Sequence, residues 1–251
     1  MPAALASLNV FKPWFDDKVG PRPGYWNTGT GSMDAMGSMT AFFPQLPAER
    51  RQQLIDYAWN TLVQSQDPQT GCWTDPLKEA GIHGLLKFSG MPRLAGKPFP
   101  RADQMAASVM RWYRHHDPVG FEQLGKERVA HDTPRLGNPI RVLALINKDR
   151  SAPITRADLA VVLRWYTKAL AAHRTPDGGI ARWRDRFDLT VMDKVAKPWT
   201  KPCGDVNGSG CILFVRTYGF ELAGLKAPPV AGADTYWQRF AAHHGIALTT
   251  L

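Results

Sequence analysis

The sequence predicts an all-α fold built from stacked helical hairpins. Three amphipathic helical segments each end in a similar turn, and strand-type alternation is almost absent. The turns read QDPQTGCW over 66–73, HDPVGF over 116–121 and RTPDGGIA over 174–181. Their glycines, Gly71, Gly120 and Gly178, recur at intervals of roughly fifty residues, a period typical of stacked supersecondary units. A single helical pair cannot bury its apolar faces alone, so the units are expected to pack on one another.

The first part of the chain divides into an arm and a helical pair. Residues 1–30 are rich in proline, glycine and aromatic residues, and we expect an ordered arm there rather than a helix. A small-residue segment at 33–43 follows, and Pro44 and Pro47 interrupt it. The next segment has a helical period. Its apolar face is formed by Leu54, Ile55, Ala58, Leu62 and Val63.

Two further units follow the first turn. The second begins at 79–88, breaks at a Pro/Gly loop over 90–100 and resumes with an apolar stripe. That stripe contains Met105, Val109, Trp112 and Tyr113. The third begins at 137–146, and its partner helix opens at Thr155 with Asp158 three residues on, which is a capping-box signature. The stripe of this partner helix is Leu159, Val162, Leu163, Tyr166 and Leu170.

The last part of the chain predicts a long loop at 182–204, a helix over 205–224 and a short helix over about 234–244. Alternating residues at 181–191 could form a small hairpin within that loop. The expected organisation is therefore an N-terminal arm over 1–30 and one helical-hairpin domain over 31–251, with four hairpins.

The net charge and the cysteine content indicate which classes of partner and of site are compatible with the sequence. A net charge of +9 and a pI of about 9.6 favour anionic partners, but the basic residues are dispersed. They form either a solvated basic face or a cleft for a polyanion, and nucleic acid is disfavoured because no known binding module is present. The absence of a C-x-x-C pair argues against a zinc knuckle or a redox motif. Cys203 and Cys211 could close a small loop or remain free thiols.

No apolar run approaches the roughly 18 residues of a transmembrane helix, so we expect no membrane span. The opening residues lack the basic start and apolar core of a signal peptide. We therefore expect a soluble protein of unknown compartment, periplasmic or secreted if a signal has been removed and cytoplasmic otherwise.

The segment QSQDPQTGCW (64–73) is similar to the Gln…Gly-x-Trp turn of the squalene cyclases. The paired helices resemble the (α/α) toroids, a group that includes the cyclase and protein-prenyltransferase repeats and the chondroitin and alginate lyases. The turns at 116–121 and 174–181 match this pattern in part. The resemblance implies an (α/α) toroid or, because complete rings of these families have more hairpins than four, an incomplete toroid of helical hairpins.

In such a ring the N-terminal ends of the inner helices open onto the central cavity. The resemblance therefore implies a site formed by polar residues at these ends. A polysaccharide-lyase interpretation uses His83, Arg141, Asn138 and Tyr25 as catalytic residues and Trp26, Asn27, Asn207 and Trp199 as substrate-binding residues. The same residues have structural explanations: Asn27 and Asn207 as turn or capping residues, Arg141 in an ion pair, and His83 as a core histidine. Trp14 is a further loop candidate for stacking on sugar rings.

The favoured function is a lyase that cleaves a uronate-containing polysaccharide by β-elimination, without a metal or another cofactor. One alternative is a non-catalytic helical-repeat binding or scaffold protein. Another is a terpene-cyclase-like or prenyltransferase-like protein, although the chain has neither the D-x-D-D run of the cyclases nor the D-x-C spacing of the transferases' zinc site. We expect a monomer closed by its own N-terminal arm, or a homodimer.

Overall fold

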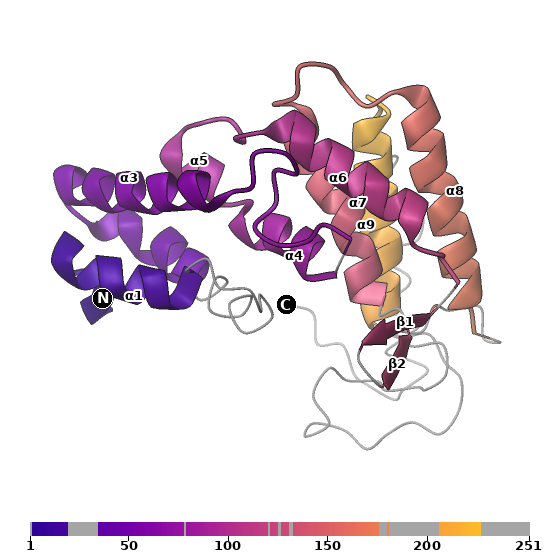
Figure 1. Cartoon of the computed structure of the whole chain (residues 1–251), viewed down its shortest axis with the longest axis horizontal. Helices are drawn as coiled ribbons and strands as arrows, with labels where there is room; N and C mark the ends of the chain where they lie inside the picture. The colour runs from indigo at the N-terminus through magenta and orange to yellow at the C-terminus, as the bar shows by residue number, and fades with distance from the viewer. Residues whose placement is uncertain are drawn as a thin grey trace, which may run out of the picture.

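The structure is a computed structural model, and it describes residues 2–19, 35–77, 79–119, 121–124, 127–130, 133–175, 180 and 206–226. Most of these residues are helical, as the sequence predicts. The helices lie in two groups along the longest axis of the molecule (Figure 1). The N-terminal group contains η1 (Ala3–Leu5), α1 (Leu8–Val19), the helical residues 35–42, η2 (Phe43–Gln45), α3 (Ala48–Ser65) and α5 (Met91–Ala95). The C-terminal group contains α4 (Glu79–Phe88), α6 (Ala102–His115), α7 (Thr133–Asn147), α8 (Arg156–Ala172) and α9 (Val206–Leu222).

Helix α1 replaces part of the non-helical arm that the sequence predicts. Phe11 and Phe15 are fully buried on one face of α1 and pack with the apolar side of α3. The Tyr57 hydroxyl of α3 also donates a hydrogen bond to the Asp16 carboxylate at 2.7 Å. The proline-rich composition of this segment favours a non-helical arm, but the i, i+4 spacing of the two phenylalanines is a helical signal that outweighs it. Trp14 lies in the same helix and is therefore not a loop tryptophan.

The turn at 66–73 joins the two groups. The Gln66 side-chain amide donates hydrogen bonds to the Gly71 and Pro100 carbonyls, and its oxygen accepts one from Arg101 at 2.9 Å. The Trp73 indole N–H donates to the Leu62 carbonyl at 2.9 Å, which ties the end of the turn back onto α3. The residues that resemble the cyclase turn therefore form a hydrogen-bonded junction between α3 and the start of α6.

The second turn leaves its helix in the same way as the first. Gln66, after α3, has φ −75° and ψ 129°, and His116, after α6, has φ −89° and ψ 130°. The carbonyl of His116 accepts a hydrogen bond from the Trp165 indole at 2.8 Å. The third helix ends differently, because His173 has φ −100° and ψ 2°. Two of the three predicted repeat turns thus share a helix-exit geometry.

Helix α7 is the centre of the C-terminal group and packs against α4, α6 and α9. Contacts on several sides explain why almost every residue of its second half is apolar. The buried residues are Ile140, Val142, Leu143, Ala144 and Ile146. Such all-round burial is typical of a helix in the interior of a domain.

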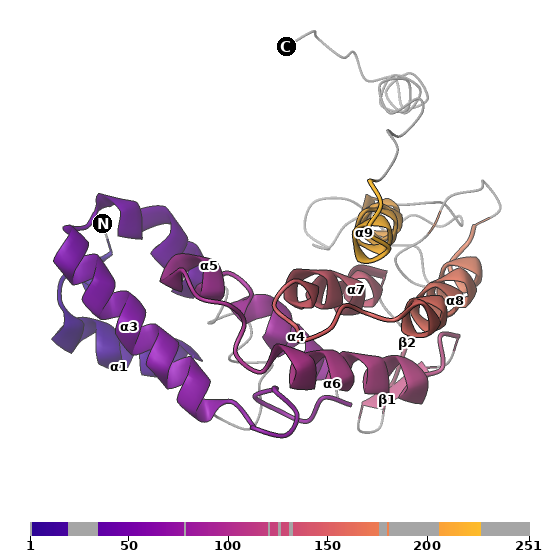
Figure 2. The ribbon, with the colours of Figure 1, turned by 90° about the horizontal axis from the view of Figure 1, so that it is seen from above.

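Helices α7 and α9 are parallel neighbours. A Cβ on Gly137 would lie 3.0 Å from Phe214, and one on Gly219 would lie 3.9 Å from Ile140, so contacts advance in the same direction along both helices. Helix α8 follows α7 and precedes α9 in the chain; it returns the chain from the end of α7 toward the start of α9 and packs against α6. Seen from above, α9, α7 and α6 lie one below the other, with α8 beside α7 (Figure 2). Neighbouring parallel helices joined by a returning helix are the arrangement expected of stacked helical hairpins.

Helix α8 confirms the predicted cap and corrects the predicted stripe. The Thr155 side chain accepts a hydrogen bond from the backbone N–H of Asp158 at 3.0 Å. The buried residues of α8 are Val162, Trp165, Tyr166 and Ala169. Leu163 is 40% exposed, so the buried face is rotated from the predicted one. Trp165 turns inward because its indole reaches the carbonyl at the end of α6.

A two-stranded antiparallel hairpin precedes α7. Strand β1 (Phe121–Leu124) pairs with β2 (Glu127–Ala130), with Phe121 opposite Ala130. The sequence prediction missed it, although Gly125-Lys126 between two short segments is a two-residue hairpin signal. The predicted hairpin at 181–191 and the last predicted helix lie outside the described residues. Within the described ranges, none of the helices has both the length and the apolar character needed to cross a bilayer.

Candidate anion-binding pocket

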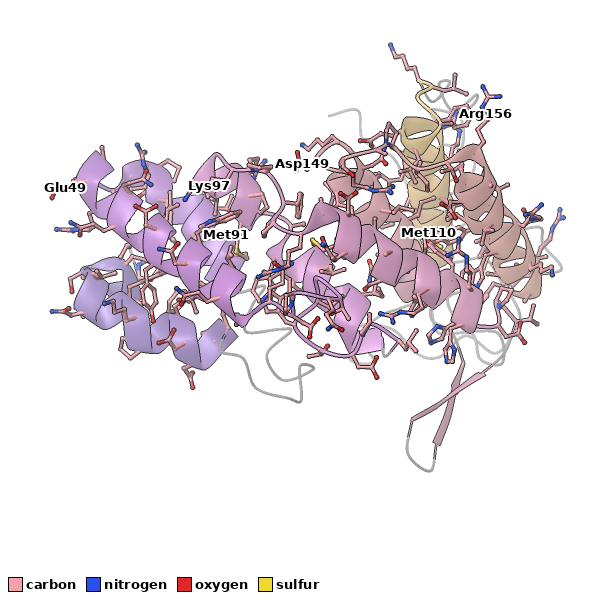
Figure 3. The ribbon with its side chains drawn as sticks, turned by 45° about the horizontal axis from the view of Figure 1, so that its top comes forward. Glu49, Met91, Lys97, Met110, Asp149 and Arg156 are labelled. Carbon is pink, nitrogen blue, oxygen red and sulfur yellow. The ribbon has the colours of Figure 1, made fainter. Side chains whose placement is uncertain are left out.

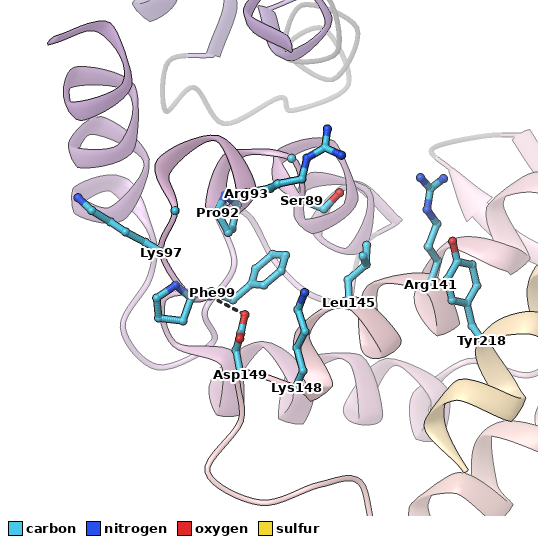
Figure 4. A pocket seen from close by; sticks show the side chains of 13 residues that line it. Ser89, Pro92, Arg93, Lys97, Phe99, Arg141, Leu145, Lys148, Asp149 and Tyr218 are labelled. Carbon is cyan, nitrogen blue, oxygen red and sulfur yellow. Dashed lines mark hydrogen bonds between the residues drawn. The ribbon is translucent and has the colours of Figure 1, made fainter. Parts of the chain in front are cut away.

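A pocket of about 670 Å³ lies between the two groups of helices. Its walls carry four basic side chains, one carboxylate and two aromatic rings (Figure 4). These residues are Arg93, Lys97, Arg141, Lys148, Asp149, Phe99 and Tyr218. Ligand pockets of roughly 300–1,000 Å³ hold drug-sized molecules, so there is room for more than a single small ion.

The first wall comes from α5 and the loop that follows it. Gly96 ends α5 with φ 64°, and its N–H and that of Lys97 bond back to the carbonyls of Arg93 and Pro92. This reversal at a left-handed glycine is a common helix ending. It places Lys97 on the same wall as Arg93, which lies in the last turn of α5. Lys97 lies with the N-terminal helices, and Asp149 lies with the C-terminal ones (Figure 3).

The second wall comes from α7, the turn after it and α9. Arg141 and Leu145 are four residues apart in α7, and Lys148 follows three residues later, just after the helix ends, so all three project to one side. Asp149 accepts a hydrogen bond from the backbone N–H of Phe99 at 2.9 Å. This contact connects the second wall to the loop of the first.

Arg141 is half-buried and is positioned by an aromatic ring. Its guanidinium carbon lies 5.8 Å from the centre of the Phe214 ring, a cation–π contact. Its buried Nε has no hydrogen-bond partner, and none of the described carboxylates forms an ion pair with it. Tyr218 lies beside it (Figure 4). Burial, and then the positive charge of Arg141, lower the pKa of Lys87 on the adjacent helix α4.

The charges of the pocket are not balanced among the described residues. Lys97 lies 3.9 Å from the Asp56 carboxylate and over the Trp59 ring, but its side chain is 43% exposed. Arg93 and Lys148 are exposed. Four cations therefore surround one carboxylate, and a pocket of one predominant charge concentrates ligands of the opposite charge.

Two of the predicted site residues, Arg141 and Asn138, have side chains that the structure describes, and of these Arg141 lines the pocket. Asn138 is half-buried one turn earlier in α7. His83 lies in α4 and Asn207 in the first turn of α9, and only their backbones are described. Both helices pack on α7, so the structure brings together the three helices that carry these predicted positions.

The remaining predicted residues, Tyr25, Trp26, Asn27 and Trp199, lie outside the described residues, as does Cys203. Cys211 is buried in the C-terminal core, and the predicted pairing with Cys203 falls outside the described residues.

The other cations of the pocket and Tyr218 are not among the residues predicted from the sequence. One signal was present, because Arg141, Leu145 and Lys148 follow a helical i, i+4, i+7 spacing. No such pattern connects Arg93 and Lys97 with α7, since only the tertiary fold brings these segments together.

Two buried tyrosines of the C-terminal core form a hydrogen bond with each other. The hydroxyl of Tyr113 donates to that of Tyr166 at 3.0 Å, and burial raises the pKa of both far above the ordinary value. In the part of the chain that the structure describes, no three His, Cys, Asp or Glu side chains are grouped as a metal site would require.

Comparisons with known protein families, with curated proteins and with solved structures found no match.

Proposed function

We propose that the pocket binds the carboxylate groups of an acidic, uronate-containing polysaccharide and that the protein cleaves this polymer by β-elimination. The observation that carries the proposal is Arg141, a half-buried arginine with no carboxylate partner among the described residues, in a pocket with three other cations. A guanidinium matches a carboxylate in geometry and can bind it through two hydrogen bonds.

The chemistry of β-elimination explains why such an arginine matters. A base removes the proton on C5 of the uronate, the C4–O bond breaks, a C4–C5 double bond forms, and the leaving oxygen takes up a proton. The carboxylate next to C5 opposes the developing negative charge unless a cation or hydrogen-bond donor neutralises it. Arg141 fits that role. Tyr218 beside it and the predicted His83 on α4 are the candidates for the proton transfers.

The proposal includes the arrangement of the helices. Parallel α7 and α9 in contact, with α6 and α8 packed together beside them, support a stack of hairpins of the (α/α) type. We propose an incomplete toroid, with the basic pocket beside the inner helices. The cavity-facing position of Asn138, His83 and Asn207 belongs to this proposal.

The two alternative functions, a terpene cyclase and a non-catalytic binding protein, predict different properties for the pocket. A terpene cyclase stabilises carbocations, and four basic side chains would oppose a developing positive charge. A non-catalytic helical-repeat protein would bind the same polyanion but would yield no product. The polysaccharide lyase and the binding protein are therefore separated by turnover.

The test is ultraviolet absorbance of an unsaturated uronyl product with alginate, glucuronan, pectate and glycosaminoglycans. We expect activity on at least one of them and a loss of about 100-fold or more in Arg141→Ala and His83→Ala, since each removes a group that acts on the transition state. The matched control is Arg164→Ala, an exposed arginine of α8, which should keep full activity. Melting temperatures of all three variants should stay near that of the wild type.

Each other outcome has one meaning. Binding without product on every polymer would favour the non-catalytic protein. A large loss of stability in Arg141→Ala or His83→Ala would assign that residue a structural role. The absence of both binding and product on all of these polymers would overturn the proposal.

A further inference from the structure

The four cations of the pocket are divided between the two groups of helices. Arg93 and Lys97 come from α5 and the turn after it, and α5 packs on α3. Arg141 and Lys148 come from α7 and the turn at its end, in the other group. The apolar residues of α5 belong to the N-terminal core, whereas those of α7 belong to the C-terminal core. The two pairs of cations are thus carried by helices that belong to different cores.

The junction beneath the pocket is mainly apolar. A small cavity of about 20 Å³ is lined by side chains of both cores, among them Trp73, Phe88 and Met105, and it shares Pro92 and Phe99 with the basic pocket. Among the described residues, the hydrogen bond from Phe99 to Asp149 is the polar contact between the lining residues of the two walls.

We infer that the ligand carries at least two separated anionic groups and bridges the two walls, one group on the Arg93–Lys97 side and another on the Arg141–Lys148 side. This rests on the proposed function and narrows it: an oligomer of several uronate units is the ligand, and a single uronate is too small to fill the site. Each wall carries two cations, and a ligand with a single anionic group reaches only one of these pairs.

Bridging has a quantitative signature. When one ligand makes both contacts, the second contact forms at a high effective concentration. The affinity of the bridging ligand is therefore far higher than that of a ligand that makes only one contact. Arg141 is half-buried and partly desolvated, whereas Arg93 and Lys97 are exposed. A monomeric uronate should therefore bind on the Arg141 side, and the α5 side should contribute only when the ligand is long enough to reach it.

The experiment is calorimetric titration with galacturonic acid and with its linear tetramer, at constant ionic strength. If the wild type cleaves the tetramer, all variants are made in the His83→Ala background. We expect the tetramer to bind about 100-fold or more tightly than the monomer. Arg93→Gln/Lys97→Gln should weaken tetramer binding by about tenfold or more and leave monomer binding within about twofold, whereas Arg141→Gln/Lys148→Gln should weaken both.

The matched control is Arg164→Gln/Lys168→Gln on the exposed face of α8, which removes the same net charge outside the pocket. It should change either affinity by less than about twofold, since exposed charges beyond a Debye length are screened. Circular dichroism and melting temperature verify that each variant is folded.

The outcomes separate this inference from the proposed function. If neither ligand binds and none of the four polymers is bound or cleaved, the proposed function fails first. If both bind with equal affinity, or if Arg93→Gln/Lys97→Gln leaves tetramer binding unchanged in a folded protein, a single anionic group suffices and the bridging inference is overturned. An equal loss in the α8 control would also overturn it, because net charge alone would then explain the effect.

Discussion

Gly71 lies where the turn after α3 meets the start of α6, and its φ of 67° is in the left-handed region. A Cβ there would lie 2.7 Å from Cγ of Met105 and 2.8 Å from its backbone nitrogen. Both the backbone conformation and the close approach thus require glycine. The neighbouring hydrogen bonds of Gln66 depend on this approach, because its amide binds the Gly71 carbonyl.

Three glycines allow these two requirements to be separated. Gly71→Ala should lower the free energy of unfolding by about 2 kcal/mol or more, through strain plus a clash with backbone. Gly96→Ala should cost about 1 kcal/mol, because Gly96 has φ 64° but open space around it. Gly37→Ala, in a helix with nothing nearby, should stabilise by about 0.5–1 kcal/mol. Urea unfolding measures all three, and a neutral Gly71→Ala would show that the junction contributes little.

Cys72 gives a pH-dependent contribution at the same junction. Burial raises the pKa of its thiol from 9.0 to about 11. The folded state therefore favours the neutral thiol, so the stabilisation is complete below pH 9 and disappears as pH rises to about 11. Across that interval the wild type should lose up to about 2–3 kcal/mol more than Cys72→Ala. Parallel urea curves for the two proteins from pH 8 to pH 10.5 test this, and equal pH slopes would contradict it.

Helix α8 shows what a single cap contributes to an element. Thr155 accepts a hydrogen bond from the Asp158 N–H and donates one to its carboxylate, both at 3.0 Å. Asp158 also forms an ion pair with Arg114 of α6. The cap therefore fixes both the start of α8 and the side chain that contacts the neighbouring helix.

We expect Thr155→Ala to lower the free energy of unfolding by about 1 kcal/mol. Thr155→Ser should retain most of the capping contribution, because serine caps as well as threonine does. Thr167→Ala is the matched control. Thr167 is exposed in the middle of α8 and bonds only to the Leu163 carbonyl of its own helix, so its loss should be near neutral. Thermal and urea unfolding give the comparison, and equal effects of the two alanine variants would exclude a capping contribution.

At the scale of the whole molecule, two apolar cores lie side by side, one centred on α1 and α3 and the other on α7. The edge-on contact of Trp73 with Phe88, with ring centres 4.7 Å apart, lies where they meet. Because α1 completes the N-terminal core, the segment that the sequence analysis assigned to an arm is part of the fold.

Deletion of residues 1–22 should therefore expose the apolar face of α3 and cause aggregation or a change in oligomeric state. Size-exclusion chromatography with light scattering measures this. As a milder form of the test, Phe11→Ala should destabilise by about 3–5 kcal/mol, whereas the adjacent Val10→Ala, at a side chain 46% exposed, should be near neutral. A truncated protein that stays folded with an unchanged oligomeric state would show that α1 is dispensable.

The sequence by itself determined the helices with a strong local signal. The stripes of α3 and α6 and the Thr155 cap of α8 depend on residues three or four positions apart, and such contacts form within a helix wherever it later packs. The turn at 66–73 was likewise recognisable, because its glycine and its capping side chains act locally. Arg141, which the sequence predicts as a site residue, lines the pocket, since a charged side chain in a largely buried helix needs a polar environment.

The tertiary structure alone decided the rest. Which face of α8 is buried depends on where Trp165 meets the end of α6, and the helical character of α1 depends on the apolar side of α3. Arg93 and Lys97 become neighbours of Arg141 only because α5 and α7 come together across a junction of two cores. Local sequence patterns encode energies over a few residues, whereas the pocket arises from contacts between residues some fifty positions apart, whose geometry is set by the packing of the whole chain.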